Sequence, residues 1–206
     1  MPCRPCPPTL LSALALFAAL LVAAAAPAPA PAPPSAPAAP AEFSIDPVHS
    51  SVIFRIQHMG VSYFHGRFNR IEGGFTLDAE KPENSSVEIL VPAESVDTNS
   101  TKRDDHIRSP DFLNASEFPE IRFKSDAVKS LGKDRFEVAG QLTLHGETKP
   151  LTVEVHQTGL AETSRGALAG FETTFTIKRS DFGMSNMLDA LGDEVRLTVA
   201  VEGRGK

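Results

Sequence analysis

The sequence predicts an all-β fold: an eight-stranded antiparallel barrel with short helices capping the barrel mouth. Three observations predict it. From Glu42 onward, apolar residues recur at every second position over long runs. The connections between these runs are mostly short, which favours strands that pair in sequence, and eight such strands close into a barrel. Two segments, 99–119 and 181–192, interrupt the alternation and are expected at the barrel mouth.

Composition limits the class of protein. The chain has 206 residues, of which 41% are hydrophobic and 22% charged, and its formal net charge is −6. These values are typical of a mildly acidic globular domain and not of a disordered chain. The negative charge also disfavours nucleic acid as a partner.

The N-terminal residues predict export. Residues 1–26 contain a single charge, Arg4, followed by an apolar run that ends in four alanines, as in a cleaved signal peptide. Residues 27–41 alternate proline with alanine and are expected to form an extended linker. The barrel domain is therefore expected at 42–206, in the periplasm or secreted. An uncleaved N-terminal membrane anchor is the alternative, because a short apolar run can still insert.

Each expected strand has an apolar face. In the first, Val52, Phe54 and Ile56 alternate with outward residues. The second changes phase after Phe68, so a bulge is expected between Phe68 and Gly74. The apolar positions of the other strands are Val87, Ile89 and Val91; Ile121 to Val128; Phe136, Val138, Leu142 and Leu144; Leu151, Val153 and Val155; Phe171, Phe175 and Ile177; and Val195, Leu197, Val199 and Val201.

The two interruptions are expected to form short helices. Residues 104–113 begin with aspartates, which favour a helix start. Here Ile107, Phe112 and Leu113 are expected to turn inward, and Asp104, Asp105 and Arg108 to stay at the rim. In 181–192 the residues Met184, Met187, Leu188 and Leu191 have the spacing of one helical face. That face would be a flexible lid or a plug of the barrel end.

Several motifs of the chain, in their order along the sequence, resemble those of a known family. They are Asp46-Pro47-Val48-His49-Ser50, His106 to Phe112, Phe118 to Phe123, Gly140 to Lys149 and Arg179 to Met184. The chain from Phe43 to about Gly203 resembles the YceI-like, polyisoprenoid-binding proteins. The resemblance implies a lipocalin-like barrel that holds a long isoprenoid chain in an apolar interior, commonly in the bacterial periplasm. It also implies a bound polyisoprenoid or isoprenoid quinone-like lipid as the ligand, with no other cofactor.

The candidate ligand-binding residues are the inward apolar side chains. They are Phe54, Ile56, Phe64, Phe68, Phe75, Ile107, Phe112, Phe123, Leu142, Leu144, Phe171, Phe175, Met184, Met187 and Leu188. Burial of a hydrocarbon chain against them contributes about 0.8 kcal/mol per methylene. The alternative is that the same residues pack a dry core. His106, Arg108 and Arg179 are the candidates for a lipid head group, and a structural hydrogen bond or salt bridge is the alternative for each.

Other functions receive weaker support from the sequence. Six histidines are present, but none has the spacing of a helical zinc motif, and no serine lies in a nucleophile elbow. A site assembled from His49, His58 and His106 with Asp105 would make the chain a periplasmic metal-linked or redox enzyme. A purely structural stress-response module is a third hypothesis. We therefore expect a binding protein with no catalytic residue and no metal, whose further partners would be a membrane surface for lipid exchange and a second copy in a homodimer.

Overall fold

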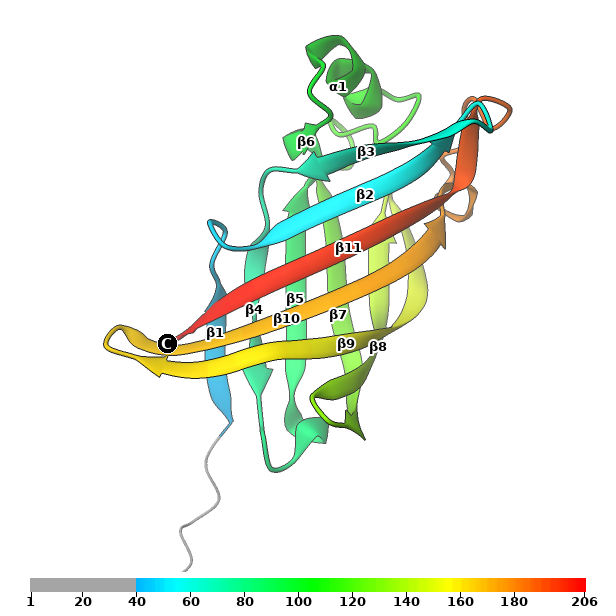
Figure 1. Cartoon of the computed structure of the whole chain (residues 1–206). Coiled ribbons are helices and arrows are strands. Elements are labelled where there is room, and N and C mark those ends of the chain that lie inside the picture. The colour runs from blue at the N-terminus through cyan, green and yellow to red at the C-terminus, as the bar shows by residue number, and fades with distance from the viewer. Residues whose placement is uncertain (1–39) are drawn as a thin grey trace, which may run out of the picture. The chain divides into compact units, whose positions relative to one another are not determined.

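The computed structural model describes residues 40–206 (Figure 1). The predicted signal peptide and nearly all of the predicted linker lie outside these residues. The strands are β1 (Ala41–Ile45), β2 (Ser51–His58), β3 (Ser62–Phe68), β4 (Glu72–Leu77), β5 (Ser86–Pro92), β6 (Val96–Asp97), β7 (Glu120–Gly132), β8 (Arg135–Leu144), β9 (Glu147–Thr163), β10 (Gly166–Lys178) and β11 (Leu191–Gly205). The helices are α1 (Thr101–Arg108) and the 3₁₀ turns η1 (Pro82–Asn84), η2 (Ala93–Ser95) and η3 (Arg179–Phe182). No helix in the described part is long and apolar enough to span a bilayer.

Eight of the strands form a closed antiparallel ring, as the sequence predicts. The order around it is β1, β4, β5, β7, β8, β9, β10 and β11, and the ring closes because β1 pairs with both β4 and β11. The long hairpins β7–β8 and β9–β10 form most of the wall, and β10 stays paired with β11 from Leu168 to Lys178. The eight-stranded barrel is confirmed.

The remaining strands extend the wall beside β11. β2 pairs with the first part of β11, between Leu191 and Ala200, whereas β1 pairs with its last residues. β3 pairs with β2, and the short β6 pairs with β3 (Figure 1). One edge of β11 is thus shared by two strands that follow each other in the chain.

The expected bulge after Phe68 is a complete break in the strand. The chain leaves the sheet at residues 69–71, where the Asn69 amide donates to the Ser95 carbonyl at 2.8 Å. β3 and β4 then pair with different neighbours, so the single strand expected over 64–77 was wrong. Gly73 in β4 has φ +122, and a Cβ there would lie 2.1 Å from the Glu88 carbonyl oxygen. Only glycine fits this conformation and this close approach.

Alternating apolar residues form the core inside the ring. Phe43 and Phe75 stack with their ring centroids 4.9 Å apart, and Phe171 meets Phe75 edge-on at 5.2 Å. Val52, Leu142 and Leu144 are buried in the same cluster. These contacts join β1, β4, β8 and β10, so aromatic packing across the ring holds the barrel together.

The two expected helices have different outcomes. α1 forms within the first interruption, as predicted. The helix predicted over 181–192 is wrong: η3 ends at Phe182 and is followed by turns, with Gly183 at φ +78 and Met187 at φ +55. An α-helix cannot pass through left-handed residues.

Candidate functional site

Two apolar cavities occupy the barrel interior. The larger, about 450 Å³, lies at the end that carries α1, and we call it the mouth cavity. Residues of β2, β3, α1 and the 184–191 segment line it. The smaller, about 160 Å³, lies deeper, and we call it the barrel cavity. Its lining is mostly aliphatic and phenylalanine side chains of the barrel strands, together with Val52 of β2.

The two cavities adjoin. Ile121, Leu142, Phe175 and Leu197 line both of them. These four residues come from β7, β8, β10 and β11. They form the apolar boundary between the cavities, which we call the side-chain ring to distinguish it from the ring of strands. A flexible chain that enters the mouth cavity would meet this ring and then the barrel cavity beyond it. The interior is therefore shaped for an elongated apolar molecule more than for a compact one.

Most of the predicted binding residues lie on these cavities. Those that line the mouth cavity are Phe54, Ile56, Phe64, Phe68, Ile107, Phe112, Leu144, Met184 and Met187. Those that line the barrel cavity are Phe75, Phe123 and Phe171, and Leu142 and Phe175 line both. The exception is Leu188, which lines neither cavity and is 43% exposed. Contact of these residues with a ligand stays a prediction.

The polar groups of the mouth cavity come mainly from two elements. His58, Ser62 and Tyr63 line it from the β2–β3 hairpin, and Arg103 and His106 from α1. Arg103 and His106 lie three residues apart and therefore share a face of the helix. The barrel cavity has one charged side chain in its lining, Glu172, and its other polar groups are hydroxyls, those of Thr76, Ser85, Ser86 and Thr173. The basic side chains of the lining are thus found at the mouth cavity only.

Arg103 is fixed at the mouth cavity. Its guanidinium lies 4.1 Å from the centre of the Phe64 ring, a cation–π contact. Its Nε donates to the Thr98 hydroxyl at 2.8 Å, and Nη2 donates to the Thr98 carbonyl at 2.7 Å. These bonds use only part of its five donors. Arg103 therefore presents a positive charge to the cavity in a defined orientation.

The three predicted head-group residues have different surroundings. His106 lines the mouth cavity, with Nε2 2.9 Å from a carboxylate oxygen of Asp111 and its ring edge-on to Phe112. Arg108 does not line it; its guanidinium donates to the carbonyls of Glu94 and Val96 and to Asp105. Arg108 therefore fixes α1 to the preceding segment.

Arg179 lines the mouth cavity, but its donors are occupied by the protein. It is 3% exposed and donates to the carbonyls of Gly192, Met184, Asn186 and Leu191 at 2.7–3.0 Å. Burial lowers the pKa of its guanidinium, and the nearby Asp193 carboxylate opposes this effect. In a helix over 181–192 the carbonyls of Met184 and Asn186 would accept hydrogen bonds from the next turn, but here they accept from Arg179, and the segment forms turns.

The expectation that Asp104 stays at the rim of the barrel is wrong. Asp104 is buried and accepts hydrogen bonds from the Thr98 amide, at 2.8 Å, and from the Thr98 hydroxyl. A buried carboxylate needs such donors, and the left-handed Asn99 (φ +59) turns the chain so that Thr98 supplies both. Ile107, Phe112 and Leu113 line the mouth cavity as expected.

The structure does not assemble the histidine site considered above. His49 precedes β2 and His58 ends it, so the eight residues of β2 hold them roughly 25 Å apart at about 3.3 Å per residue. Only His58 and His106 of that set line the same cavity. Asp105 is exposed and pairs with Arg108. These four residues cannot bind one ion together.

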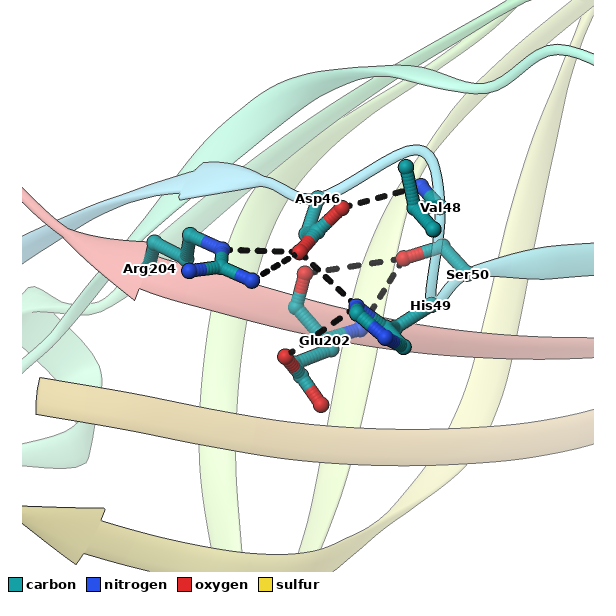
Figure 2. Close-up of polar contacts among 6 residues, drawn as sticks. All are labelled: Asp46, Val48, His49, Ser50, Glu202 and Arg204. Carbon is teal, nitrogen blue, oxygen red and sulfur yellow. Dashed lines mark hydrogen bonds and ion pairs between the residues drawn. The ribbon is translucent and has the colours of Figure 1, made fainter. Parts of the chain in front are cut away.

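A different polar cluster lies where β1 meets β2 (Figure 2). Asp46, His49 and Glu202 could offer three metal ligands within 4.8 Å of one another, among the described residues. However, Arg204 donates to Asp46 from Nε and Nη2 at 2.7 Å, and the Val48 amide donates to its other oxygen at 2.9 Å. The His49 Nδ1 lies 2.9 Å from the carboxylate. The charge of Asp46 is thus balanced within the protein.

These contacts of the Asp46 cluster stabilise the junction of β1 and β11, where the barrel closes. The hydrogen bond with His49, and then that with Arg204, hold the pKa of the Asp46 carboxyl well below its usual range. The Asp46 amide also donates to the Glu202 carbonyl at 2.8 Å. Asp46 directly follows β1, and the hydrogen bonds with Arg204 and Glu202 connect it to β11. β11 is the strand with which β1 closes the ring of eight strands.

Sequence reasoning missed several cavity residues. Arg103, His58 and Tyr63 line the mouth cavity but were not among the predicted site residues. Helical spacing from His106 could have indicated Arg103. Tyr63 lies on the opposite phase of its strand from Phe64, so alternation alone would place it outside the barrel.

Comparison with known proteins agrees with this architecture. The model of the YceI-like domain family matches residues 43–203. The chain belongs to the YceI-like family. A UPF0312 protein of Pseudomonas aeruginosa is 41% identical over 169 residues, which cover 81% of this chain and 88% of the relative. An Azotobacter vinelandii UPF0312 protein is 40% identical over 196 residues, covering 94% and 96%. Protein YceI of Salmonella arizonae is 41% identical over 169 residues, covering 81% and 88%.

Solved YceI-like structures have the same fold. The Campylobacter jejuni YceI protein superposes with a TM-score of 0.66 at 26% identity, covering 73% of this chain and 90% of that one. Burkholderia cenocepacia BcnA gives 0.69 at 22% identity, covering 77% and 98%. A polyisoprenoid-binding domain from Saccharophagus degradans gives 0.66 at 14% identity, covering 80% and 98%. The YceI-like barrel is thus common to this chain and these three structures.

Proposed function

We propose that this protein is an exported carrier that holds a polyisoprenoid or a related long-chain amphiphilic lipid inside its barrel. The observation that carries the proposal is the pair of adjoining, mainly apolar cavities, of which only the mouth cavity has basic side chains in its lining. An amphiphile would place its chain across the side-chain ring formed by Ile121, Leu142, Phe175 and Leu197. Its head group would lie beside Arg103 and His106.

The energetics favour chain burial over head-group recognition. Each methylene moved from water to the apolar lining contributes about 0.8 kcal/mol, so a chain that fills both cavities gains more than one exposed arginine supplies. The Saccharophagus degradans structure is that of a polyisoprenoid-binding domain, which supports the same ligand class. The protein would then transport, store or sequester its lipid without chemical change.

Organic extraction of the purified protein, followed by mass spectrometry, tests the proposal directly. We expect a lipid with a long apolar chain, present at up to one molecule per barrel. Protein stripped by extraction and refolding is then incubated with an isoprenoid quinone and with a polyprenyl phosphate. An empty extract together with no uptake of either lipid would refute a lipid-carrier function.

Export is a separate part of the proposal. We expect cleavage near residue 26 and recovery of the mature protein from the periplasm or the medium. The N-terminal sequence of protein isolated from cell fractions measures this. Recovery of the intact N-terminus in the membrane fraction would favour the anchored alternative, and light scattering of the soluble form would decide between a monomer and a homodimer.

A further inference from the structure

Large apolar side chains gather at the barrel end that carries the mouth cavity. Met59, Val61 and Tyr63 in the β2–β3 hairpin, and Met187 and Leu188 in the turns before β11, are all exposed. Val61 is the most exposed of them, at 84%. We call these five residues the apolar tip. Four other exposed large apolar residues lie elsewhere among the described residues, namely Val48, Ile53, Leu131 and Leu160.

The two segments of the apolar tip are adjacent in space. The Met59 amide donates to the Ala190 carbonyl at 2.7 Å, and His58 pairs with Leu191. The β2–β3 turn therefore lies directly against the turns that hold Met187 and Leu188. Exposed apolar residues that are joined in this way form one surface, whereas singly scattered ones are ordinary.

The apolar tip borders the opening of the mouth cavity. Tyr63 and Met187 are exposed to solvent and also line that cavity. The same side chains thus belong to the outer surface and to the wall of the interior. A molecule that moves across the apolar tip therefore enters the cavity directly. The polar side chains that it passes from the β2–β3 hairpin are His58 and Ser62.

The backbone of the apolar tip is unusual. Seven non-glycine residues of the described chain have positive φ, and five of them are Asn, Lys, Asp or His. The two apolar ones, Met59 (φ +52) and Met187 (φ +55), both belong to the apolar tip. Left-handed conformation is disfavoured for such side chains, and exposing them to water is disfavoured too. Strain that holds apolar residues in water points to a partner that covers them.

The charge around the apolar tip indicates which partner that is. Segments 58–62 and 184–188 contain no Asp, Glu, Lys or Arg, and the whole chain carries a net charge of −6. The adjacent charges are Asp189, which follows Leu188, and the Arg55 guanidinium, which lies 4.0 Å from the centre of the Tyr63 ring. An apolar surface with so few charges inserts into the headgroup and acyl boundary of a bilayer, whereas protein interfaces are enriched in Arg and aromatic anchors. An acidic protein gains nothing from anionic lipid, so insertion and not charge attraction must drive the contact.

We propose that the apolar tip docks on a phospholipid bilayer and sets the mouth cavity against the acyl chains. The carried lipid then passes between membrane and barrel without crossing water. This inference rests on the proposed lipid-carrier function, since it assigns a partner to the same cavity. Docking is weak and reversible, because only a few side chains insert.

Vesicle flotation of the processed protein, as purified with its own N-terminus, tests the docking. The tip variant carries Met59→Ser, Val61→Ser and Leu188→Ser, none of which lines a cavity. The matched control, Leu131→Ser with Leu160→Ser, removes exposed apolar residues elsewhere. We expect wild type and control to float with phosphatidylcholine vesicles, and the tip variant to bind at least about tenfold more weakly, since about three side chains no longer insert. Circular dichroism confirms that all three proteins are folded.

Two further measurements complete the test. Binding to phosphatidylcholine vesicles should be unchanged in 0.5 M NaCl and no weaker than binding to phosphatidylglycerol vesicles. Uptake of an isoprenoid quinone from detergent solution should be equal in wild type and tip variant, while transfer from vesicles should be slower in the variant. Absence of flotation by wild type, equal flotation by the tip variant, or binding that needs anionic lipid and low salt overturns the docking. Absence of uptake from detergent refutes the carrier function itself, whatever the vesicles show.

Discussion

The two ends of the barrel are built from the same antiparallel strands but differ in their connections. At the end that carries α1, the connections 93–119 and 179–190 are long, and the apolar tip is exposed beside the mouth cavity. At the opposite end the connections are shorter: 78–85 has eight residues, and 133–134 and 164–165 have two each, with charged residues in or beside them. There β1 closes the ring, fixed by the Asp46 cluster (Figure 2).

This difference shows that the strands determine the barrel and its interior, whereas the connections determine where the interior opens. Alternation makes every strand apolar inside along its whole length, so it does not distinguish one end from the other. Among the connections 78–85, 133–134 and 164–165 at one end, only Ser85 lines a cavity. Long connections with buried polar anchors, Arg179 and Asp104, hold the other end in a defined shape around the cavity.

The largest expected effect is at the mouth. Arg179→Met should lower the free energy of unfolding by about 3 kcal/mol or more, because four buried or half-buried carbonyls lose their donor. Urea denaturation measures this. Arg122→Met removes the exposed ion pair with Glu88 on the barrel wall and should cost under about 1 kcal/mol. Equal effects of the two changes would contradict the role given to Arg179.

The side-chain ring between the cavities should control ligand length. Ile121→Trp narrows it, so we expect binding of a long polyprenyl chain to fall about tenfold or more, with little change for a chain that fits the mouth cavity alone. The chain has no tryptophan, so the new residue also reports binding by fluorescence. Ile53→Trp, on an exposed residue of β2, supplies the control reporter. Equal loss for both chain lengths would show that the ligand does not pass the ring.

The closing end should be sensitive to acid. The pKa of Asp46 is lowered in the folded protein, whereas it is about 3.9 in an unfolded chain. Its carboxylate therefore contributes stability above about pH 4, and this contribution is lost as the pH falls toward the folded-state pKa. Asp46→Asn should lower the Tm at pH 7 and flatten its fall between pH 5 and pH 2, relative to wild type and to the control Asp189→Asn, which changes an exposed aspartate in the turns before β11. An unchanged pH profile would show that the Asp46 cluster does not stabilise the closure.

The smallest effect should be on head-group preference. Arg103→Met should weaken binding of farnesyl phosphate by a few-fold, or about 0.5–1 kcal/mol, because the guanidinium is partly solvated. Binding of farnesol, which has no charge, should stay the same. Isothermal titration of both ligands measures the difference, with Arg122→Met as the control that lies off both cavities. A parallel loss for both ligands would mean that Arg103 acts only through the structure of α1.

Sequence patterns predicted the barrel and its lining because both depend on local alternation. Phe54, Leu142 and Phe175 follow period two, and the cavities lie on that face. The break after Phe68 was not predictable in the same way, because it depends on pairing with strands far along the chain. β1 was missed as a strand for the same reason: it is short and is fixed by two distant partners.

Features fixed by single side chains were also beyond pattern analysis. The spacing of Met184, Met187 and Leu191 is helical, but the Arg179 guanidinium donates to the carbonyls of Met184 and Asn186, which a helix would need as acceptors. Asp104 looks like a solvated helix-start charge, yet Thr98 supplies two donors that allow its burial. Sequence periodicity indicates which face of a strand or helix is apolar. It does not indicate which buried polar group forms a hydrogen bond with which partner.

The pairing of β1 with β11 has a practical consequence for handling the molecule. Phe43 is paired with Gly205, and the Lys206 amide donates to the Glu42 carbonyl at 3.0 Å. The chain therefore enters and leaves the barrel side by side, at the end away from the mouth cavity (Figure 1). Immobilising the protein on a sensor surface through either of these points would orient the barrels alike, with every opening directed toward the solution.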